Sequence, residues 1–246
     1  MRIEDYPRNI ELLVNQHLGN YIHAGSKALL IERARLFGRF FEKRRRNRPV
    51  IWKFSIPREH PLIFNVSSVD SCRLQVDVSC EIEGRDDKIN KQNILVRVWC
   101  LEQRISFRRS IDAIELEDIL KSLDWRRVVF RLHFDLRALD TKIPEPLYHL
   151  HIGGDPLSEE NSWFPKQIKV PRFPYPPMDL ILLSEFVLMN FFQEQSEQLR
   201  KKPEWESLVR KSQYYFQREY FNRCMKHIDS KTCTLLGNLA SFEQGN

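Results

Sequence analysis

Apolar and polar residues alternate along the stretch CRLQVDVSCEIE, residues 72–83. Its apolar positions are Leu74, Val76, Val78, Cys80 and Ile82. Its polar positions are Arg73, Gln75, Asp77, Ser79 and Glu81. A period of two is that of a half-buried antiparallel strand, in which one side faces a core and the other faces solvent. The stretch therefore predicts an antiparallel sheet with one apolar face.

The segments on either side of this stretch extend the same architecture. Further strands are expected over residues 51–56, 93–103, 127–137 and 147–153, with a polar loop over 84–91 and a short helical turn over 116–123. Apolar residues recur with the helical period over 8–22 and 26–46 before the strands, and over 177–194 and 203–228 after them. We expect an α+β fold, in which an antiparallel β-sheet of about four to six strands is flanked by N-terminal and C-terminal helices.

A length of 246 residues suits one large domain or two small ones, and we expect one domain because no strong linker divides the chain. Within the α+β domain over 1–246 we distinguish a basic helical segment (1–48), the antiparallel sheet (49–153), a proline-rich connection (154–176), two C-terminal helices (177–228) and a weakly ordered tail (229–246).

Composition excludes several classes of protein. Only 8 glycines are present, and neither a G-x-G-x-x-G nor a P-loop motif occurs, which argues against nucleotide-binding folds of those kinds. The 5 cysteines form no C-x-x-C pair, so neither a zinc finger nor a disulfide framework is expected. The most apolar stretch, 178–192, contains Asp179 and Glu185 and is too short to span a bilayer. We expect a cytoplasmic protein that has no membrane partner.

The strands at 127–137 and 147–153 carry the candidate active site. In a hairpin across the 138–146 loop, Asp135 lies opposite His149. His133 then lies opposite His151, with the Cβ atoms of each pair about 5 Å apart. The cluster expected on this face comprises Arg131, His133, Asp135, His149 and His151.

Such a set can act in two chemical ways. Two histidines can serve as general base and general acid on a phosphodiester, with Arg131 neutralising the developing charge and Asp135 orienting an imidazole. This alternative needs no cofactor. In the other alternative, two histidines and the carboxylate hold a divalent metal. A third interpretation is a solvated polar face, which is common on half-buried sheets.

Positive charge is concentrated in one segment. Residues 27–53 hold ten basic residues against two acidic ones, a net charge of +8 in a chain of +6, so the remainder carries −2. Like charges at helical i, i+4 spacing cost about 0.2–0.5 kcal/mol each, which points to an acidic partner. Nucleic-acid phosphate is the expected partner. The residues assigned to it are Arg35, Arg39, Lys43, Arg44, Arg45, Arg46 and Arg48. The alternatives are an acidic protein, acids of this chain between 81 and 87, or solvation.

Four stretches resemble an uncharacterised bacterial protein family with an H-F-D, H-L, P-R pattern. They are RLHFDLRAL (131–139), YHLHIGG (148–154), VPRFPYPPMDLILLSEFVLMNFF (170–192) and RKSQYYF (210–216). The matching positions are His133, Phe134, Asp135, His149, Leu150, Gly153, Pro171, Arg172, Asn190 and Phe191. The resemblance covers roughly residues 125–195.

The resemblance implies an association with toxin–antitoxin or defence gene clusters, and it adds Arg172 to the candidate site as a phosphate or carboxylate contact. It supplies no reaction. We therefore expect a nucleic-acid-associated component of a bacterial defence or toxin-type system that cleaves phosphodiesters by histidine acid–base chemistry. The alternatives are a non-catalytic subunit or adaptor that binds a larger protein partner, and a small-ligand binder that uses the same face. Whether the protein is an enzyme stays open at this point.

Overall fold

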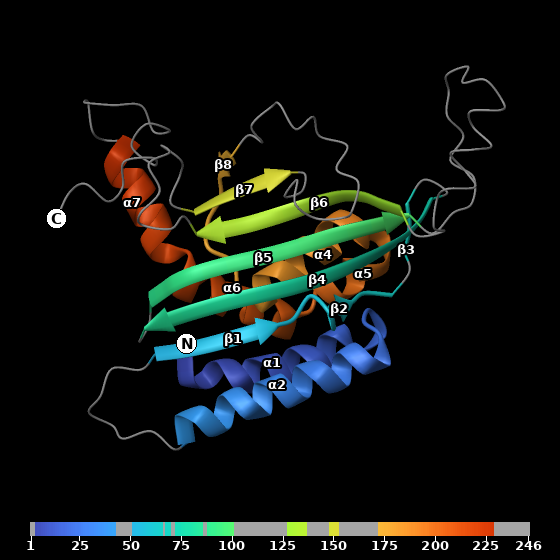
Figure 1. Ribbon diagram of the computed structural model, residues 1–246, viewed down its shortest axis with the longest axis horizontal. Coiled ribbons are helices and arrows are strands. Elements are labelled where there is room, and N and C mark those ends of the chain that lie inside the picture. Colours follow the sequence, from blue (N-terminus) through green and yellow to red (C-terminus); the bar gives the residue numbers. More distant parts are fainter. Residues whose placement is uncertain are drawn as a thin grey trace.

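The computed structural model describes residues 3–42, 51–65, 67–69, 72–85, 88–100, 127–136, 148–152 and 172–228. Their strands form one antiparallel sheet with the order β1-β4-β5-β6-β7-β8, and the short strands β2 and β3 also pair with β4 (Figure 1). The bounds are β1 Ile51–Ile56, β2 Leu62–Ile63, β3 Ser67–Val69, β4 Cys72–Arg85, β5 Lys88–Cys100, β6 Arg127–Leu136, β7 Tyr148–Ile152 and β8 Arg172–Pro174.

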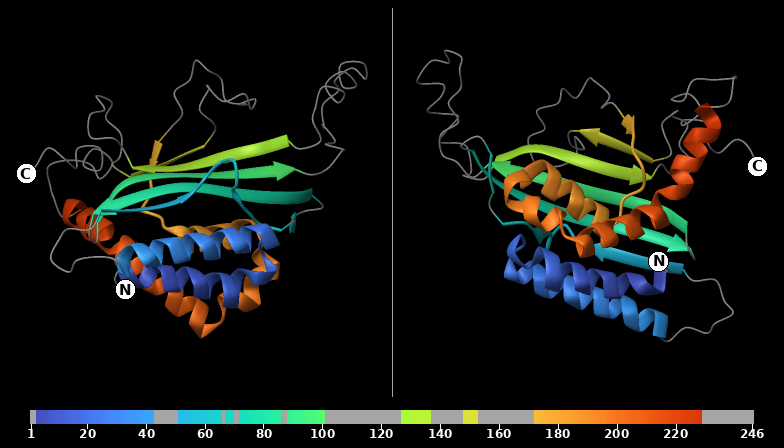
Figure 2. Two further views of the ribbon diagram at one scale, coloured as in Figure 1. Left: turned by 60° about the horizontal axis from the view of Figure 1, so that its bottom comes forward. Right: turned by 180° about the vertical axis from the view of Figure 1, so that it is seen from behind.

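The helices precede and follow these strands in the chain, which confirms the α+β class. They are α1 Tyr6–Leu12, α2 Ala24–Glu42, α4 Leu180–Phe191, α5 Gln193–Arg200, α6 Pro203–Phe216 and α7 Arg218–Ile228. A 3-10 turn, Ile3–Asp5, precedes α1, and the helical path continues beyond α1 as a π turn, Leu13–His17, and a 3-10 turn, Leu18–Asn20. Figure 2 shows α1, α2, α4, α5 and α6 on one face of the sheet, which leaves the other face without a helix from the described residues.

The core lies between the sheet and these helices. Val78 of β4 and Val96 of β5 are fully buried, and Phe134 of β6 packs edge-on against Phe186 of α4 with 5.3 Å between ring centroids. The apolar stripes predicted for the N-terminal helices are confirmed. In α1 and the two turns that follow it, Ile10, Leu13, Val14 and Leu18 are buried; in α2, Leu30, Ala34 and Phe37 are buried.

One buried polar side chain anchors the start of the C-terminal helices to the sheet. The Gln92 Oε1 accepts a hydrogen bond from the Met178 backbone N–H at 2.9 Å, and its Nε2 donates to the Phe134 carbonyl at 3.4 Å. Asp179 then caps α4, because its Oδ1 accepts from the Leu182 N–H at 2.9 Å.

Among the described residues, no helix is long and apolar enough to cross a membrane.

Two parts of the sheet differ from the sequence prediction. The loop expected over 84–91 is wrong, because β4 and β5 stay paired through Gly84↔Ile89 and Arg85↔Lys88. A bulge after Glu83 shifts the register and hides the continued pairing from a simple alternation pattern. The second difference is β8, Arg172–Pro174, which lies in the segment expected to be a connection.

The C-terminal helices are divided more finely than the periodicity indicated. The apolar segment begins as a helix at Leu180 rather than at 177, and its helix α4 ends before Phe192, whose backbone leaves helical geometry. The segment from Pro203 is interrupted at Gln217, between α6 and α7. The expected turn over 116–123 and tail over 229–246 lie outside the described residues.

Candidate active site

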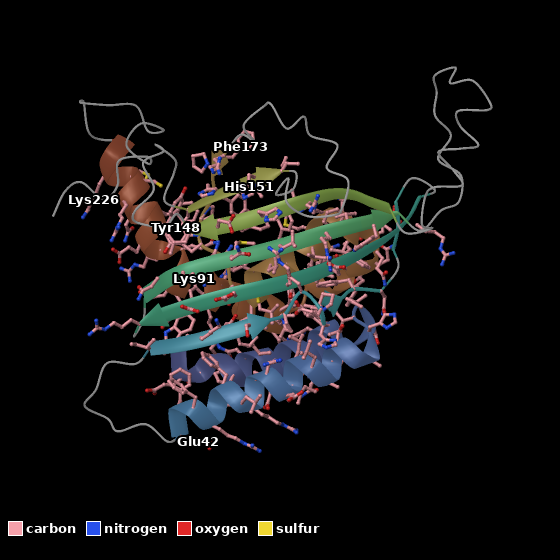
Figure 3. The ribbon with its side chains drawn as sticks, in the orientation of Figure 1. Glu42, Lys91, Tyr148, His151, Phe173 and Lys226 are labelled. Atoms are coloured by element: carbon pink, nitrogen blue, oxygen red, sulfur yellow. The ribbon has the colours of Figure 1, made fainter. Side chains whose placement is uncertain are left out.

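The strand register brings the predicted site residues together. β6 and β7 pair His133 with His151 and Asp135 with His149, which confirms the pairing expected from the sequence. β8 then places Arg172 opposite His151, so three strands contribute to one row; Figure 3 labels His151 on β7. We call this group the open-face cluster, and it comprises Arg131, His133, Asp135, His149, His151 and Arg172.

The rings within the cluster lie in contact. The imidazoles of His133 and His151 are stacked, with centroids 4.6 Å apart and planes within 15° of each other. His149 lies beside His151 at 5.8 Å between centroids. The Nε2 of His151 is 2.8 Å from the Oδ2 of Asp135, which is hydrogen-bond distance and sets the orientation of that imidazole.

The cluster is largely withdrawn from solvent. His133, Arg131 and His149 are only 6%, 5% and 4% exposed, whereas Asp135 and His151 are half-buried. Two buried atoms, His133 Nε2 and Asp135 Oδ1, have no hydrogen-bond partner within the described parts of the chain. A buried polar atom without a partner costs about 1–3 kcal/mol, so such atoms in a folded protein call for an explanation.

Burial also changes the protonation of His133. Its pKa is lowered to about 4, mainly because burial disfavours the charged imidazolium and further because of the neighbouring His151. The Asp135 carboxylate opposes this shift, while the Arg131 guanidinium adds to it. His133 is therefore neutral near pH 7.

A second polar group lies beside the cluster on the same face, and the sequence pattern did not identify it as part of a site. Asp77 on β4 pairs with Arg97 on β5, and Arg97 in turn lies opposite Arg131. The Asp77 Oδ1 is 2.8 Å from Arg97 Nε, and its Oδ2 accepts from Trp99 Nε1 at 2.7 Å. The alternation in 72–83 places Asp77 on the polar face of the sheet, as the structure does. The expectation that this face is exposed to solvent is wrong at Asp77, which is buried.

Three residues of the cluster have the geometry of a metal-ligand set. His133, Asp135 and His151 each offer one donor atom, and these atoms lie within 4.8 Å of one another. All three come from two paired strands, so the backbone ladder holds them in place.

The basic helix lies apart from the open-face cluster. Arg35 and Arg39 are exposed on α2, which contacts β1 and β2 near the opposite edge of the sheet (Figure 1). Arg35 approaches Glu11 of α1 at 3.8 Å. The remaining predicted contacts, Lys43, Arg44, Arg45, Arg46 and Arg48, lie outside the described residues.

Glu81 and Glu83, two of the acids expected as internal partners of the basic helix, bind lysines of the sheet instead. Glu81 binds Lys53 at 2.8 Å and Lys91 at 2.6 Å on the open face of the sheet. These two lysines lower the pKa of Glu81 to about 2. Glu83 lies 3.0 Å from Lys53 as well. The internal-pairing alternative for the basic helix therefore gains no support from Glu81 or Glu83.

No protein-family model matches the chain, and neither a curated protein nor a solved structure does. The function of the open-face cluster therefore has to be argued from its own residues.

Proposed function

We propose that this protein cleaves phosphodiester bonds in nucleic acid, as a cytoplasmic component of a bacterial defence or toxin-type system, with the open-face cluster as its active site. The observation that supports this most is the 2.8 Å contact between His151 and Asp135 beside the stacked ring of His133. The bacterial setting is inferred from the resemblance of residues 125–195 to the uncharacterised family described above.

The proposed reaction is hydrolysis. A water oxygen forms a bond to phosphorus while the bond from phosphorus to the leaving oxygen breaks. The water proton passes to His151, whose other ring nitrogen is held by Asp135. His149 acts as the general acid and gives a proton to the leaving oxygen, so the products are a phosphate monoester and a free hydroxyl. Arg131 and Arg172, on the same face, neutralise charge on the phosphoryl oxygens.

Direct incubation with end-labelled RNA and DNA tests this proposal, each as single and double strands, with divalent ions and with EDTA. His151→Gln is expected to lower the cleavage rate by about 10²–10⁴, the range for loss of a general base. The matched control is His23→Gln, because His23 is exposed and its backbone N–H donates to the carbonyl of Ile63 in β2, a strand that pairs with β4 rather than with β6 or β7. Failure of the wild-type protein to cleave any substrate, or equal rates in wild type and His151→Gln, would refute the proposal.

We further propose that the exposed side of α2 docks the phosphate backbone. Arg35 and Arg39 lie four residues apart and are both exposed. Because each phosphate contact adds about 0.9 to the slope of log affinity against log salt on duplex DNA, the Arg35→Ala/Arg39→Ala variant should lower that slope by about 1–2. Arg210→Ala on α6 is the control, since Arg210 is exposed and already pairs with Glu206. An unchanged slope in the double variant would contradict this docking surface.

A second candidate function is a non-catalytic subunit that binds a larger protein partner. It is favoured by α7, which extends past the end of the sheet (Figure 1) and exposes Phe221 and Met225 by 50% and 57% at a spacing of one helical turn. Exposed apolar pairs of this kind are found at protein interfaces. Co-purification from a native host would support it if Phe221→Glu loses a partner that Asn222→Glu, changed at an exposed polar neighbour, retains.

A further inference from the structure

Two buried polar atoms of the open-face cluster are left without a hydrogen-bond partner among the described residues. His133 Nε2 and Asp135 Oδ1 are both buried and make no hydrogen bond within the part of the chain that the structure describes. They belong to side chains two positions apart on β6, which therefore project from the same side of the sheet. An acid–base pair made of His151 and Asp135 uses neither atom, so it leaves this cost unexplained.

We propose that His133, Asp135 and His151 together bind one divalent first-row transition-metal ion of the zinc class. Their donor atoms lie within 4.8 Å of one another, and the side chain of His133 that offers one of them is more than nine-tenths buried. Two imidazoles and one carboxylate are the donors that such ions take in hydrolytic and redox proteins, where the remaining positions stay open.

The observed spacing requires little rearrangement. Ligand atoms about 2.0–2.2 Å from one zinc ion lie about 3.0–3.5 Å from each other. The His151 Nε2 and Asp135 Oδ2 atoms, 2.8 Å apart, need to separate by only a few tenths of an ångström for an ion to bind both. A carboxylate that binds the ion through both oxygens also gives the unpartnered Asp135 Oδ1 its contact. His133 lies opposite His151 in the ladder, with its ring already stacked on that of His151, and rotation of its side chain brings the third donor in.

The other members of the cluster surround this centre without being ligands. His149 lies beside His151 rather than between the donors, and it is absent from the group whose donor atoms converge. Arg131 stands next to His133 along β6, where its charge opposes a cation but attracts an anion bound to that cation. Arg97, opposite Arg131, is neutralised by Asp77.

The role of the ion rests on the proposed function, whereas its binding does not. In hydrolysis the ion would take over water activation from His151, because a bound divalent ion lowers the pKa of water from about 15.7 to about 7. His149 would still supply the leaving-group proton.

Metal binding alone tests the site. Chelator-treated full-length protein is titrated with Co²⁺, followed by its visible absorption and by calorimetry, and then with competing Zn²⁺. One equivalent is expected to bind, and His133→Gln and Asp135→Asn should each weaken binding at least about 10-fold. His23→Gln, changed at an exposed histidine, and His149→Gln should retain it. Far-UV circular dichroism checks that each variant is folded.

A second measurement needs no variant. In the ¹⁵N spectrum of the wild-type imidazoles, Zn²⁺ should shift the ring nitrogens of His133 and His151 alone. No binding by wild type, shifts confined to other histidines, or loss in His149→Gln with retention in His133→Gln would each overturn the metal site. Co²⁺ binding without nucleic-acid cleavage refutes only the proposed function, and cleavage that persists in EDTA without Co²⁺ binding refutes only the metal site.

Discussion

The cap of α4 predicts a measurable pH dependence of stability. Asp179 is 1% exposed, and burial raises its pKa to about 6 despite the hydrogen bond from the Leu182 N–H. The titratable neighbours on the elements packed against it are Tyr6 of α1 and Cys80 of β4. The pKa of Cys80 is raised to about 12 and that of Tyr6 is raised as well, so both are neutral and offer no compensating charge.

The direction in which stability changes with pH depends on whether the folded or the unfolded state binds the proton more tightly. Between the pKa of an unfolded aspartate, about 4, and the folded value of about 6, the folded state holds the proton more tightly, so this residue lowers the free energy of unfolding as pH rises. Two pKa units correspond to about 3 kcal/mol, lost between pH 4 and pH 6. Asp179→Asn keeps a side-chain oxygen that accepts from the Leu182 N–H but has no charge to bury. Its free energy of unfolding, relative to that of wild type, should therefore rise by about 3 kcal/mol between pH 4 and pH 6.

Urea denaturation at pH 4, 5, 6 and 7, monitored by tryptophan fluorescence, measures this difference. Comparison of wild type with Asp179→Asn cancels the titration of other carboxylates, such as Glu81 with its lowered pKa. Asp179→Ala is the control for capping, and it should be less stable than Asp179→Asn by about 0.5–2 kcal/mol. If the difference in unfolding free energy between wild type and Asp179→Asn stays constant with pH, or shrinks as pH rises, burial does not raise the pKa of Asp179.

Three further perturbations test the sheet and the helices by urea denaturation. Asp77→Ala removes the buried carboxylate that binds the half-buried Arg97 and the Trp99 N–H, and the free energy of unfolding should fall by about 1–3 kcal/mol; an unchanged free energy would contradict a stabilising role for Asp77. Phe134→Ala opens a core cavity and should cost about 3–5 kcal/mol, whereas Phe173→Ala, at a half-exposed site, should cost far less. Gly38→Ala should add about 0.5–1 kcal/mol, because a Cβ there meets Pro7 at an ordinary 3.6 Å and removes backbone entropy from the unfolded chain; destabilisation would contradict this packing.

The histidine face could be predicted because two local rules fix it. A period of two assigns each residue of a strand to a side, and the pairing of two consecutive strands then sets which residues oppose each other. His133 and His151 follow both rules, so their pairing could be predicted from the sequence. Arg172 was assigned to the site only by the resemblance to a family. Its strand β8 is three residues long and contains Pro174, and so short a segment shows no periodicity.

The sequence does not show how deeply each side chain is buried. Alternation puts Asp77 on the polar side of β4 but does not indicate that this side is buried, because burial depends on segments distant in the chain. The stacking of His133 on His151 and the unpartnered atoms of the cluster likewise depend on side-chain rotamers that no pattern encodes. The interruption at Gln217 was missed because apolar residues continue with helical spacing on both sides of it.

Among the described strands, β8 forms one edge of the sheet, and its sequence is of a kind that disfavours self-association. Edge strands with free backbone donors and acceptors are templates on which other chains add strands and aggregate. β8 spans only Arg172–Pro174, and proline has no N–H to offer a neighbouring strand. At the other edge, β1 carries Lys53, a charged side chain of the kind that discourages stacking. The histidine row thus lies beside an edge on which fibril growth is disfavoured.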